Sequence, residues 1–377
     1  MLKFWTSDAM APVAPITATP PTDAASITAA SIADIVATDI RPRLADIDQR
    51  GFYPETALRR LGQAGAFSRH IANDADGLTA AITAMSEVGE TCLSTAFCMW
   101  CQDALVWYLD RSPNRELAAR LLGDVSSGRR LGGTGLSNPM KSFSGVEPLA
   151  LQGERVAGGW RVNGRLPWVS NLGDDHLFAS IFAAQNGQRV MTVFECGAEG
   201  LKLAQNAHFI ALEGTRTFTV LLRDVFIPDA DVIAEDAAAF VPTIRQGFVL
   251  LQLGMALGAA RGAADAMDED AIGRANAAWL PHSPSSLRER ANAIAVRASV
   301  HAHNSADPSR AAFLDVLRLR LDANWLALDA TQALSLQLGA RGYLAGCDAD
   351  RRRREAQFVA IVTPSIKHIT RELGMPS

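Results

Sequence analysis

The spacing of apolar and polar residues indicates helices over the first third of the chain. A helix begins at residues 53–55 with a proline in its first turn, and apolar residues follow at helical spacing. A longer apolar helix is expected over residues 93–109, and an amphipathic helix over residues 112–123. These patterns predict an N-terminal α-helical domain at residues 26–125, preceded by a disordered tail at residues 1–25.

The middle of the chain has the pattern of a β-domain. Short β-prone runs are separated by Gly, Asn and Asp, and their spacing favours a mainly antiparallel sandwich or barrel. Strands do not alternate with helices, and no G-x-G-x-x-G motif occurs, so a dinucleotide-binding Rossmann unit is not expected. We predict a β-domain at residues 126–238, with strands near residues 149–151, 160–162, 176–182, 189–194 and 215–225.

The last third is helical again, which predicts a four-helix-bundle-like domain at residues 239–377. One long helix is expected over residues 245–268, with Gly254, Gly258 and Gly262 on one face, where another helix could approach closely, in a subunit interface or in a monomeric bundle core. Further helices are expected at 287–303, 311–338 and 348–362. The predicted fold class is therefore α+β: an N-terminal helical domain, a central β-sandwich or barrel, and a C-terminal helical bundle.

Composition and charge indicate an ordinary globular protein. The 377 residues are 48% hydrophobic and 20% charged, and the formal net charge is −4. This balance gives no reason to expect nucleic acid or an anionic membrane as a partner. The N-terminal segment lacks the long apolar region of a secretory signal, and the cysteine count of five is odd, so we expect reduced thiols and a cytoplasmic protein.

Two groups of residues could hold a metal or act in redox chemistry, and both have a simpler explanation. Cys98 and Cys101 form a C-x-x-C pair inside an apolar run, where core cysteines on one buried helix are favoured over a redox or zinc site. His301 and His303 lie two residues apart on an expected helix, so their rings diverge and metal binding is not expected. No H-E-x-x-H, G-x-S-x-G or Walker pattern is present.

Five segments resemble motifs of the acyl-CoA dehydrogenase family, in the family's order and over about residues 30–377. Each motif alone is weak, but five in the correct order are specific, and the one around Trp168 is the most specific. The segments are Phe52-Tyr-Pro-Glu-Thr-Ala-Leu-Arg-Arg-Leu-Gly-Gln-Ala-Gly65, Leu131-Gly-Gly-Thr-Gly-Leu-Ser-Asn-Pro139, Val162-Asn-Gly-Arg-Leu-Pro-Trp-Val-Ser-Asn171, Glu213-Gly-Thr-Arg-Thr-Phe-Thr219 followed by Val225-Phe-Ile-Pro228, and Gly339-Ala-Arg-Gly-Tyr343 followed by Arg354-Glu-Ala356.

The resemblance implies a flavin-dependent oxidoreductase that holds FAD, with FMN as the alternative. A flavin ring has apolar faces and a polar edge, so its site needs an aromatic wall and nearby hydrogen-bonding groups. Trp168 would wall one face, and Ser170, two residues along the same strand, would place a hydroxyl near flavin N5. The cofactor-binding residues implied by the resemblance are Leu136, Ser137, Trp168, Val169, Ser170, Gly339, Ala340 and Ser365. Of these, Gly339 and Ala340 would touch the FAD of a neighbouring subunit in a homodimer or homotetramer.

The sequence departs from the family at the catalytic base. Family members use a carboxylate to remove the α-proton of an acyl thioester. The expected position is Thr363, which cannot act as a general base at neutral pH, and the alternative stretch at residues 246–253 contains no acid. The catalytic residue is therefore unknown. The arginine that meets the FAD pyrophosphate is also unassigned, because Arg274, Arg288 and Arg290 are all candidates.

Other polar residues add little to this picture. His176 and His208 lie in the β-domain, where either could reach a substrate cavity, although such histidines are more often structural or exposed. The basic run 351–354 is expected to form ion pairs with Asp348, Asp350 and Glu355, with an anion or phosphate contact as the alternative.

Three functions remain open. The first is a dehydrogenase-like oxidoreductase that acts on an acyl-CoA thioester or a related substrate, with an unusual base and an electron-transfer flavoprotein as a partner. The second is a monooxygenase of the same fold, which would receive reduced flavin from a flavin reductase and need no α-proton base. The third is a non-catalytic homologue that binds a flavin or a partner.

Overall fold

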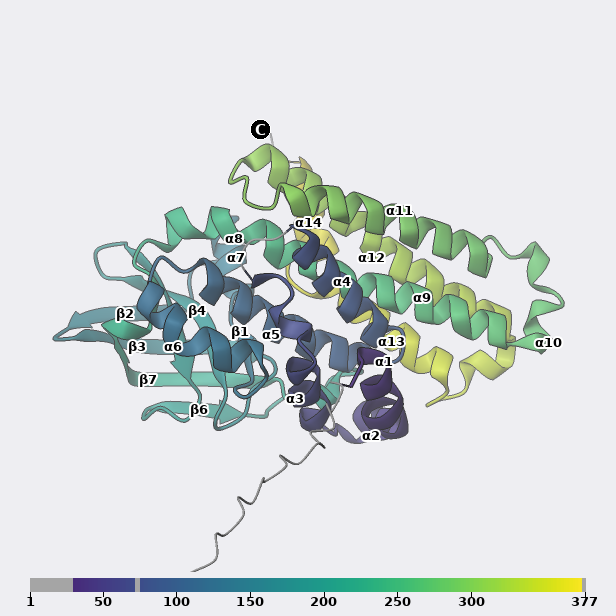
Figure 1. Cartoon of the computed structure of the whole chain (residues 1–377), viewed down its shortest axis with the longest axis horizontal. Helices are drawn as coiled ribbons and strands as arrows, with labels where there is room; N and C mark the ends of the chain where they lie inside the picture. Colours follow the sequence, from purple (N-terminus) through teal and green to yellow (C-terminus); the bar gives the residue numbers. More distant parts are fainter. Residues whose placement is uncertain (1–29, 72–74, 375–377) are drawn as a thin grey trace, which may run out of the picture.

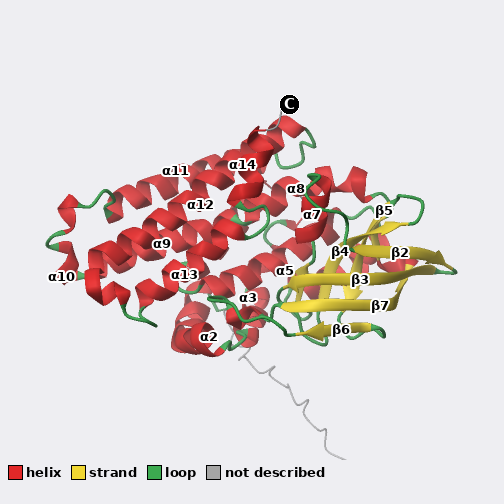
Figure 2. Cartoon of the chain, turned by 180° about the vertical axis from the view of Figure 1, so that it is seen from behind, coloured by secondary structure: helices red, strands yellow, loops and turns green. Residues whose placement is uncertain are grey.

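The computed structural model describes residues 30–71 and 75–374, and within them two helical regions flank one sheet along the chain (Figure 1). The sheet occupies one end of the molecule and the long C-terminal helices the other (Figure 2). The predicted α+β fold class is confirmed. The tail expected at residues 1–25 lies outside the described residues.

The N-terminal helices surround a buried one, α5. Its residues are buried from Leu93 to Leu109, so its apolar run needs no polar face. The last of these helices continues past Gly123, because a single exposed glycine does not end a helix whose neighbours favour it. The α-helices of this region are α1 (Ile32–Ile35), α2 (Leu44–Arg50), α3 (Glu55–Gln63), α4 (Ala75–Gly89), α5 (Leu93–Arg111) and α6 (Arg115–Ser126).

The central sheet has eight strands in the order β6-β7-β3-β2-β4-β5-β8, with β1 paired to β4. All pairs are antiparallel except β1 with β4 and β2 with β4. Three strands, β1, β6 and β8, were not predicted, because three or four residues are too few to show alternation. The strands are β1 (Gly132–Thr134), β2 (Leu151–Val156), β3 (Gly159–Val169), β4 (Leu177–Ala184), β5 (Arg189–Glu195), β6 (Leu201–Ala204), β7 (Phe218–Pro228) and β8 (Val232–Ala234).

The two faces of the sheet belong to two different cores. On β4, Leu177 and Ala179 join the core formed mainly by the helices, whereas Phe178 and Phe182 enter a second core. Strands from β2 to β8 contribute to this second core, so the sheet encloses apolar side chains of its own, as the predicted sandwich or barrel requires.

The C-terminal helices form a bundle, but the single helix expected over residues 245–268 is wrong. The structure has two helices that meet at Gln252, a polar residue whose side chain bonds outside its own helix. The chain over Ala237–Glu269 is long and apolar enough to cross a membrane, yet 94% of its most apolar window is buried inside the protein, as in a core helix. The helices are α7 (Ser137–Phe143, before β2), α8 (Ala237–Leu251), α9 (Leu253–Glu269), α10 (Ala271–Arg274), α11 (Pro284–His303), α12 (Arg310–Leu338), α13 (Asp348–Ile361) and α14 (Ile366–Gly374).

Gly254 and Gly258 of α9 allow a close contact with another helix of the same chain, α4. A Cβ on Gly258 would lie 2.6 Å from the carbonyl oxygen of Ser86 and 2.8 Å from Cα of Gly89, both on α4. A Cβ on Gly254 would lie 2.7 Å from Cβ of Met85 on the same helix. The small-residue face therefore brings α4 of the N-terminal region against the bundle, as Figure 1 also shows.

Candidate functional site

The first segment of the candidate site is the junction between β1 and α7. Leu136 and Ser137, two of the cofactor-binding residues that the resemblance implies, lie where β1 has ended at Thr134 and α7 begins at Ser137. Pro139 favours the helix here, because proline is well tolerated in the first turn. Leu136 is buried, and its backbone N–H donates to the Thr134 hydroxyl at 3.3 Å.

The second segment is the end of β3. The Trp168 side chain is 60% exposed, whereas Val169 and Ser170 are buried. β3 ends at Val169, so Ser170 lies just beyond the strand, and the pairing with β7 shifts register between Leu166 and Val169. The Ser170 hydroxyl lies 2.6 Å from the Thr217 hydroxyl.

Asn171 fixes the chain after the tryptophan. Its φ is 63°, a left-handed conformation that asparagine tolerates better than most residues. Its Nδ2 donates to the Gly132 carbonyl at 2.6 Å, and the Tyr53 hydroxyl donates to its Oδ1 at 2.7 Å. A Cβ on Gly133 would lie 2.2 Å from the Ser170 carbonyl oxygen, so the end of β3 packs directly on β1. Only glycine at residue 133 allows this approach.

The third segment is the loop between α13 and α14. The Thr363 hydroxyl lies 2.7 Å from the Ser137 hydroxyl, so the expected base position meets the start of α7. Gln252 donates to the Thr363 carbonyl at 2.8 Å and accepts from Arg320 Nε at 2.9 Å. Ser365 accepts from the His368 backbone N–H at 3.2 Å and so caps α14.

Sequence reasoning missed Gln252 and Arg320. A glutamine inside the apolar stretch Leu250–Leu253 was a usable signal, because a buried polar group needs a partner. Arg320 gave no such signal, since it alternates with leucines on both sides. It is fully buried, and burial lowers the pKa of its guanidinium to about 9.

The two candidate histidines of the β-domain differ in their surroundings. His176 is buried, its Nδ1 is 2.9 Å from the Asn171 carbonyl oxygen, and burial lowers its pKa. It therefore holds the turn after β3. The side chain of His208 is 90% exposed, and its Nδ1 is 3.9 Å from a Glu213 carboxylate oxygen.

The basic run is paired within the chain, as expected. Arg351 meets Glu355 at 2.7 Å, Arg352 meets Asp348 at 2.6 Å, and Arg354 meets Asp350 at 3.0 Å.

The two cysteines of the C-x-x-C pair are part of the hydrophobic core. Cys98 and Cys101 are fully buried, and burial raises the pKa of both thiols. Over residues 30–71 and 75–374, no group of three or more His, Cys, Asp or Glu side chains could hold a metal ion.

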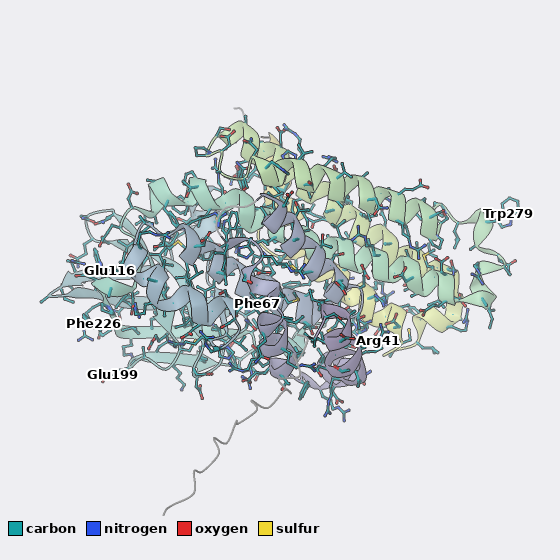
Figure 3. All side chains as sticks on the ribbon, in the orientation of Figure 1. Arg41, Phe67, Glu116, Glu199, Phe226 and Trp279 are labelled. Atoms are coloured by element: carbon teal, nitrogen blue, oxygen red, sulfur yellow. The ribbon has the colours of Figure 1, made fainter. Side chains whose placement is uncertain are left out.

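Gly339 and Ala340 are exposed and follow the end of α12, which lies against α10 because a Cβ on Gly273 would be 2.5 Å from the Gln337 carbonyl oxygen. Helix α10 is at the end of the bundle away from the sheet (Figure 2). The structure does not bring Gly339 and Ala340 to Trp168 within one chain. At the same end, Trp279 is 92% exposed and points away from the bundle (Figure 3). Arg288 pairs with Asp265 and Asp268, and Arg290 with Asp329, whereas Arg274 has no ion pair within the described part of the chain.

The residues around Trp168 fit a flat aromatic cofactor. An indole left largely exposed at the end of a strand offers an apolar wall. The hydroxyls of Ser137 and Ser170 each have one partner among the described residues, and a hydroxyl can both donate and accept. Each can therefore also bond to the polar edge of a ring.

Comparison with known proteins identifies relatives of the sequence. A family model described as "Acyl-CoA dehydrogenase, N-terminal domain" matches residues 22–129. The chain is 24% identical over 234 residues to benzylmalonyl-CoA dehydrogenase of Aromatoleum aromaticum, covering 59% of this chain but only 62% of that protein. It is 23% identical over 354 residues to the short-chain specific acyl-CoA dehydrogenase of Clostridium acetobutylicum, covering 88% of this chain and 91% of the relative.

Solved structures share the fold. Butyryl-CoA dehydrogenase from Megasphaera elsdenii superposes with a TM-score of 0.79 at 15% identity, over 91% of this chain and 95% of that one. A nitrososynthase from Micromonospora carbonacea superposes with a TM-score of 0.73 at 19% identity, over 91% and 94% of the two chains. The same fold therefore occurs in proteins with different activities.

Proposed function

Because this chain belongs to the acyl-CoA dehydrogenase superfamily, we propose that it binds FAD and oxidises an acyl-CoA thioester or a related substrate. The exposed indole of Trp168 carries the proposal. It stands at the end of β3, which packs on β1. The helix that follows β1, α7, begins at Ser137, whose hydroxyl meets that of Thr363. A bound flavin would accept a hydride from the substrate.

FAD is preferred over FMN because the far end of the bundle offers a place for its second phosphate. Of the three candidate arginines, Arg274 is the one whose charge no carboxylate of the described residues neutralises. It lies with Gly339 and Ala340 at the same end, where these groups would meet the FAD of a neighbouring subunit. This arrangement requires a homodimer or homotetramer.

A monooxygenase is the second candidate. Thr363 occupies the usual base position, and its side chain meets a hydroxyl rather than a carboxylate. A reaction with reduced flavin and oxygen needs no base for an α-proton, and the fold is shared with a nitrososynthase.

The flavin itself provides the first test. The purified protein should be yellow and release FAD on denaturation, and an acyl-CoA thioester should bleach it under anaerobic conditions. Bleaching by a flavin reductase alone, followed by a transient peroxyflavin spectrum with oxygen, would favour the monooxygenase. A colourless protein without flavin affinity would leave a non-catalytic homologue.

Trp168→Ala tests the site directly. We expect the dissociation constant for FAD to rise about fivefold or more, since stacking on an aromatic ring contributes on the order of 1 kcal/mol. Phe226→Ala is the matched control, because Phe226 is also an exposed aromatic of the sheet, on β7 (Figure 3). Equal FAD affinity in both variants would contradict the placement of the ring.

A further inference from the structure

Helix α14 lies across the start of the candidate site. Ser365 caps the helix two residues after Thr363, and Arg371 donates from the helix to the Ser144 carbonyl at 2.7 Å, just beyond the end of α7. Ser137, the first residue of α7, meets Thr363 just before α14. The two helices are therefore connected near both ends of α7, through Thr363 at its start and through Arg371 after its end. His368 lies on α14 between these two connections.

The ring of His368 has one nitrogen near a carboxylate and one without a partner. Its side chain is 9% exposed, and Nε2 lies 3.9 Å from Oε1 of Glu372, whose side chain is 7% exposed. Arg310 on α12 approaches the other oxygen of Glu372 at 3.4 Å. Nδ1 is buried and has no hydrogen-bond partner among the described residues. An imidazole with a carboxylate near one nitrogen and no partner at the other nitrogen can take up a proton at the second one.

The charges around the ring come from three elements. Asn138, next to Ser137, donates to Glu147 at 2.9 Å, so this carboxylate belongs to the same end of α7. Burial lowers the pKa of His368, which leaves the imidazole neutral and able to accept a proton at pH 7. The charged groups that act on the ring are Glu372 and Arg371 on α14, and Lys141 and Glu147 from α7 and the segment after it, with Arg310 of α12 behind Glu372.

We propose that Nδ1 of His368 is the proton acceptor that takes the place of the missing carboxylate. The α-carbon–hydrogen bond of a bound thioester breaks, the proton goes to Nδ1, and the electron pair stays on the α-carbon, delocalised into the thioester carbonyl. The carboxylate of Glu372, near the other ring nitrogen, stabilises the imidazolium that forms. This inference rests on the proposed function, in which the hydride then leaves from the β-carbon.

Hydrogen exchange at the α-carbon tests the base apart from the oxidation. The thioester 3,3-dimethylbutanoyl-CoA has α-hydrogens but no β-hydrogen, so it cannot be oxidised to an enoyl product. In D2O the native holoenzyme should exchange its α-hydrogens, as mass spectrometry would record. His368→Gln should slow exchange at least about 100-fold, with FAD content and melting temperature unchanged. His303→Gln, on the exposed face of α11, should exchange like the native protein.

The pH profile distinguishes a proton acceptor from a merely structural histidine. Exchange should rise with pH as the His368 imidazolium loses its proton, and then level off. Glu372→Gln removes the carboxylate that favours the imidazolium, so the inflection should move to lower pH. If His368→Gln folds poorly, added imidazole should restore exchange to His368→Ala.

The outcomes separate the two proposals. Undiminished exchange in folded His368→Gln would overturn the role of His368 and leave the proposed function standing. If native protein with bound FAD neither exchanges α-hydrogens nor is bleached by any acyl-CoA, the proposed function fails, and the role of His368 fails with it.

Discussion

Burial at the end of α4 raises the pKa of Glu90 to about 7, against the partial compensation of Arg261 and Arg352. An unfolded glutamate has a pKa near 4.5, so between these two values the folded state binds more protons than the unfolded state. The free energy of unfolding should therefore fall as pH rises from about 4.5 to 7, and stay low above that range.

Glu90→Gln should remove this pH dependence. We expect the variant to gain about 1 kcal/mol over the native protein at pH 8 and little at pH 5, a modest value because Glu90 is only partly buried and solvent screens its charge. Chemical denaturation at both pH values measures the difference. Glu116→Gln, at an exposed position of α6, is the control; an equal gain there would refute the argument.

The residues of the site were predicted better by type than by surroundings. Trp168 is exposed, and Ser137 and Thr363 meet although they lie 226 positions apart in the sequence. The end of β3 could not be predicted to the residue: Ser170 lies one position beyond the strand, and the register shift before Val169 depends on the partner strand β7 and not on β3 alone. The partners of Gln252 could not be predicted, because hydrogen bonds across the fold leave no local pattern.

At the scale of elements, long helices with a clear apolar face were predicted within a few residues, as for α11 and α12. The break between α8 and α9 was missed, because apolar periodicity continues through it and only the hydrogen bonds of Gln252 distinguish it. Short strands such as β6 form because β7 offers an unpaired edge, which is a tertiary cause.

The approach of α4 to α9 gives a prediction at this scale. Gly258→Ala should lower the free energy of unfolding by about 2 kcal/mol or more, because its Cβ would collide with the backbone of Ser86 and Gly89. Gly123→Ala is the matched control inside α6, where a Cβ would meet nothing within 4 Å. There, alanine should stabilise by about 0.5–1 kcal/mol. Thermal unfolding of both variants decides the point, and equal effects would show that the close approach does not matter.

At the scale of the whole molecule, the predicted order of helices, sheet and helices holds, but the contacts that join the three regions were not visible in the sequence. Arg354 is the clearest case. It was expected to pair with neighbours on its own helix, and it does so with Asp350. It also donates to both carboxylate oxygens of Asp48 on α2, at 2.9 and 2.8 Å, and to the Ile210 carbonyl of the β-domain at 2.8 Å.

Arg354→Ala should therefore weaken the contacts that connect the C-terminal bundle to the N-terminal helices and to the β-domain. The side chain of Asp48 is only 5% exposed, so the variant leaves a buried carboxylate without its counter-ion, and we expect a loss of about 2–4 kcal/mol in the free energy of unfolding. Arg353→Ala is the control, since Arg353 is more exposed and, among the residues that the structure describes, pairs only with Asp350, at 3.5 Å; it should change stability by less than about 0.5 kcal/mol. Hydrogen exchange should then rise in α2 of Arg354→Ala before it rises in the bundle. Uniform exchange together with unchanged stability would mean that Arg354 does not join the regions.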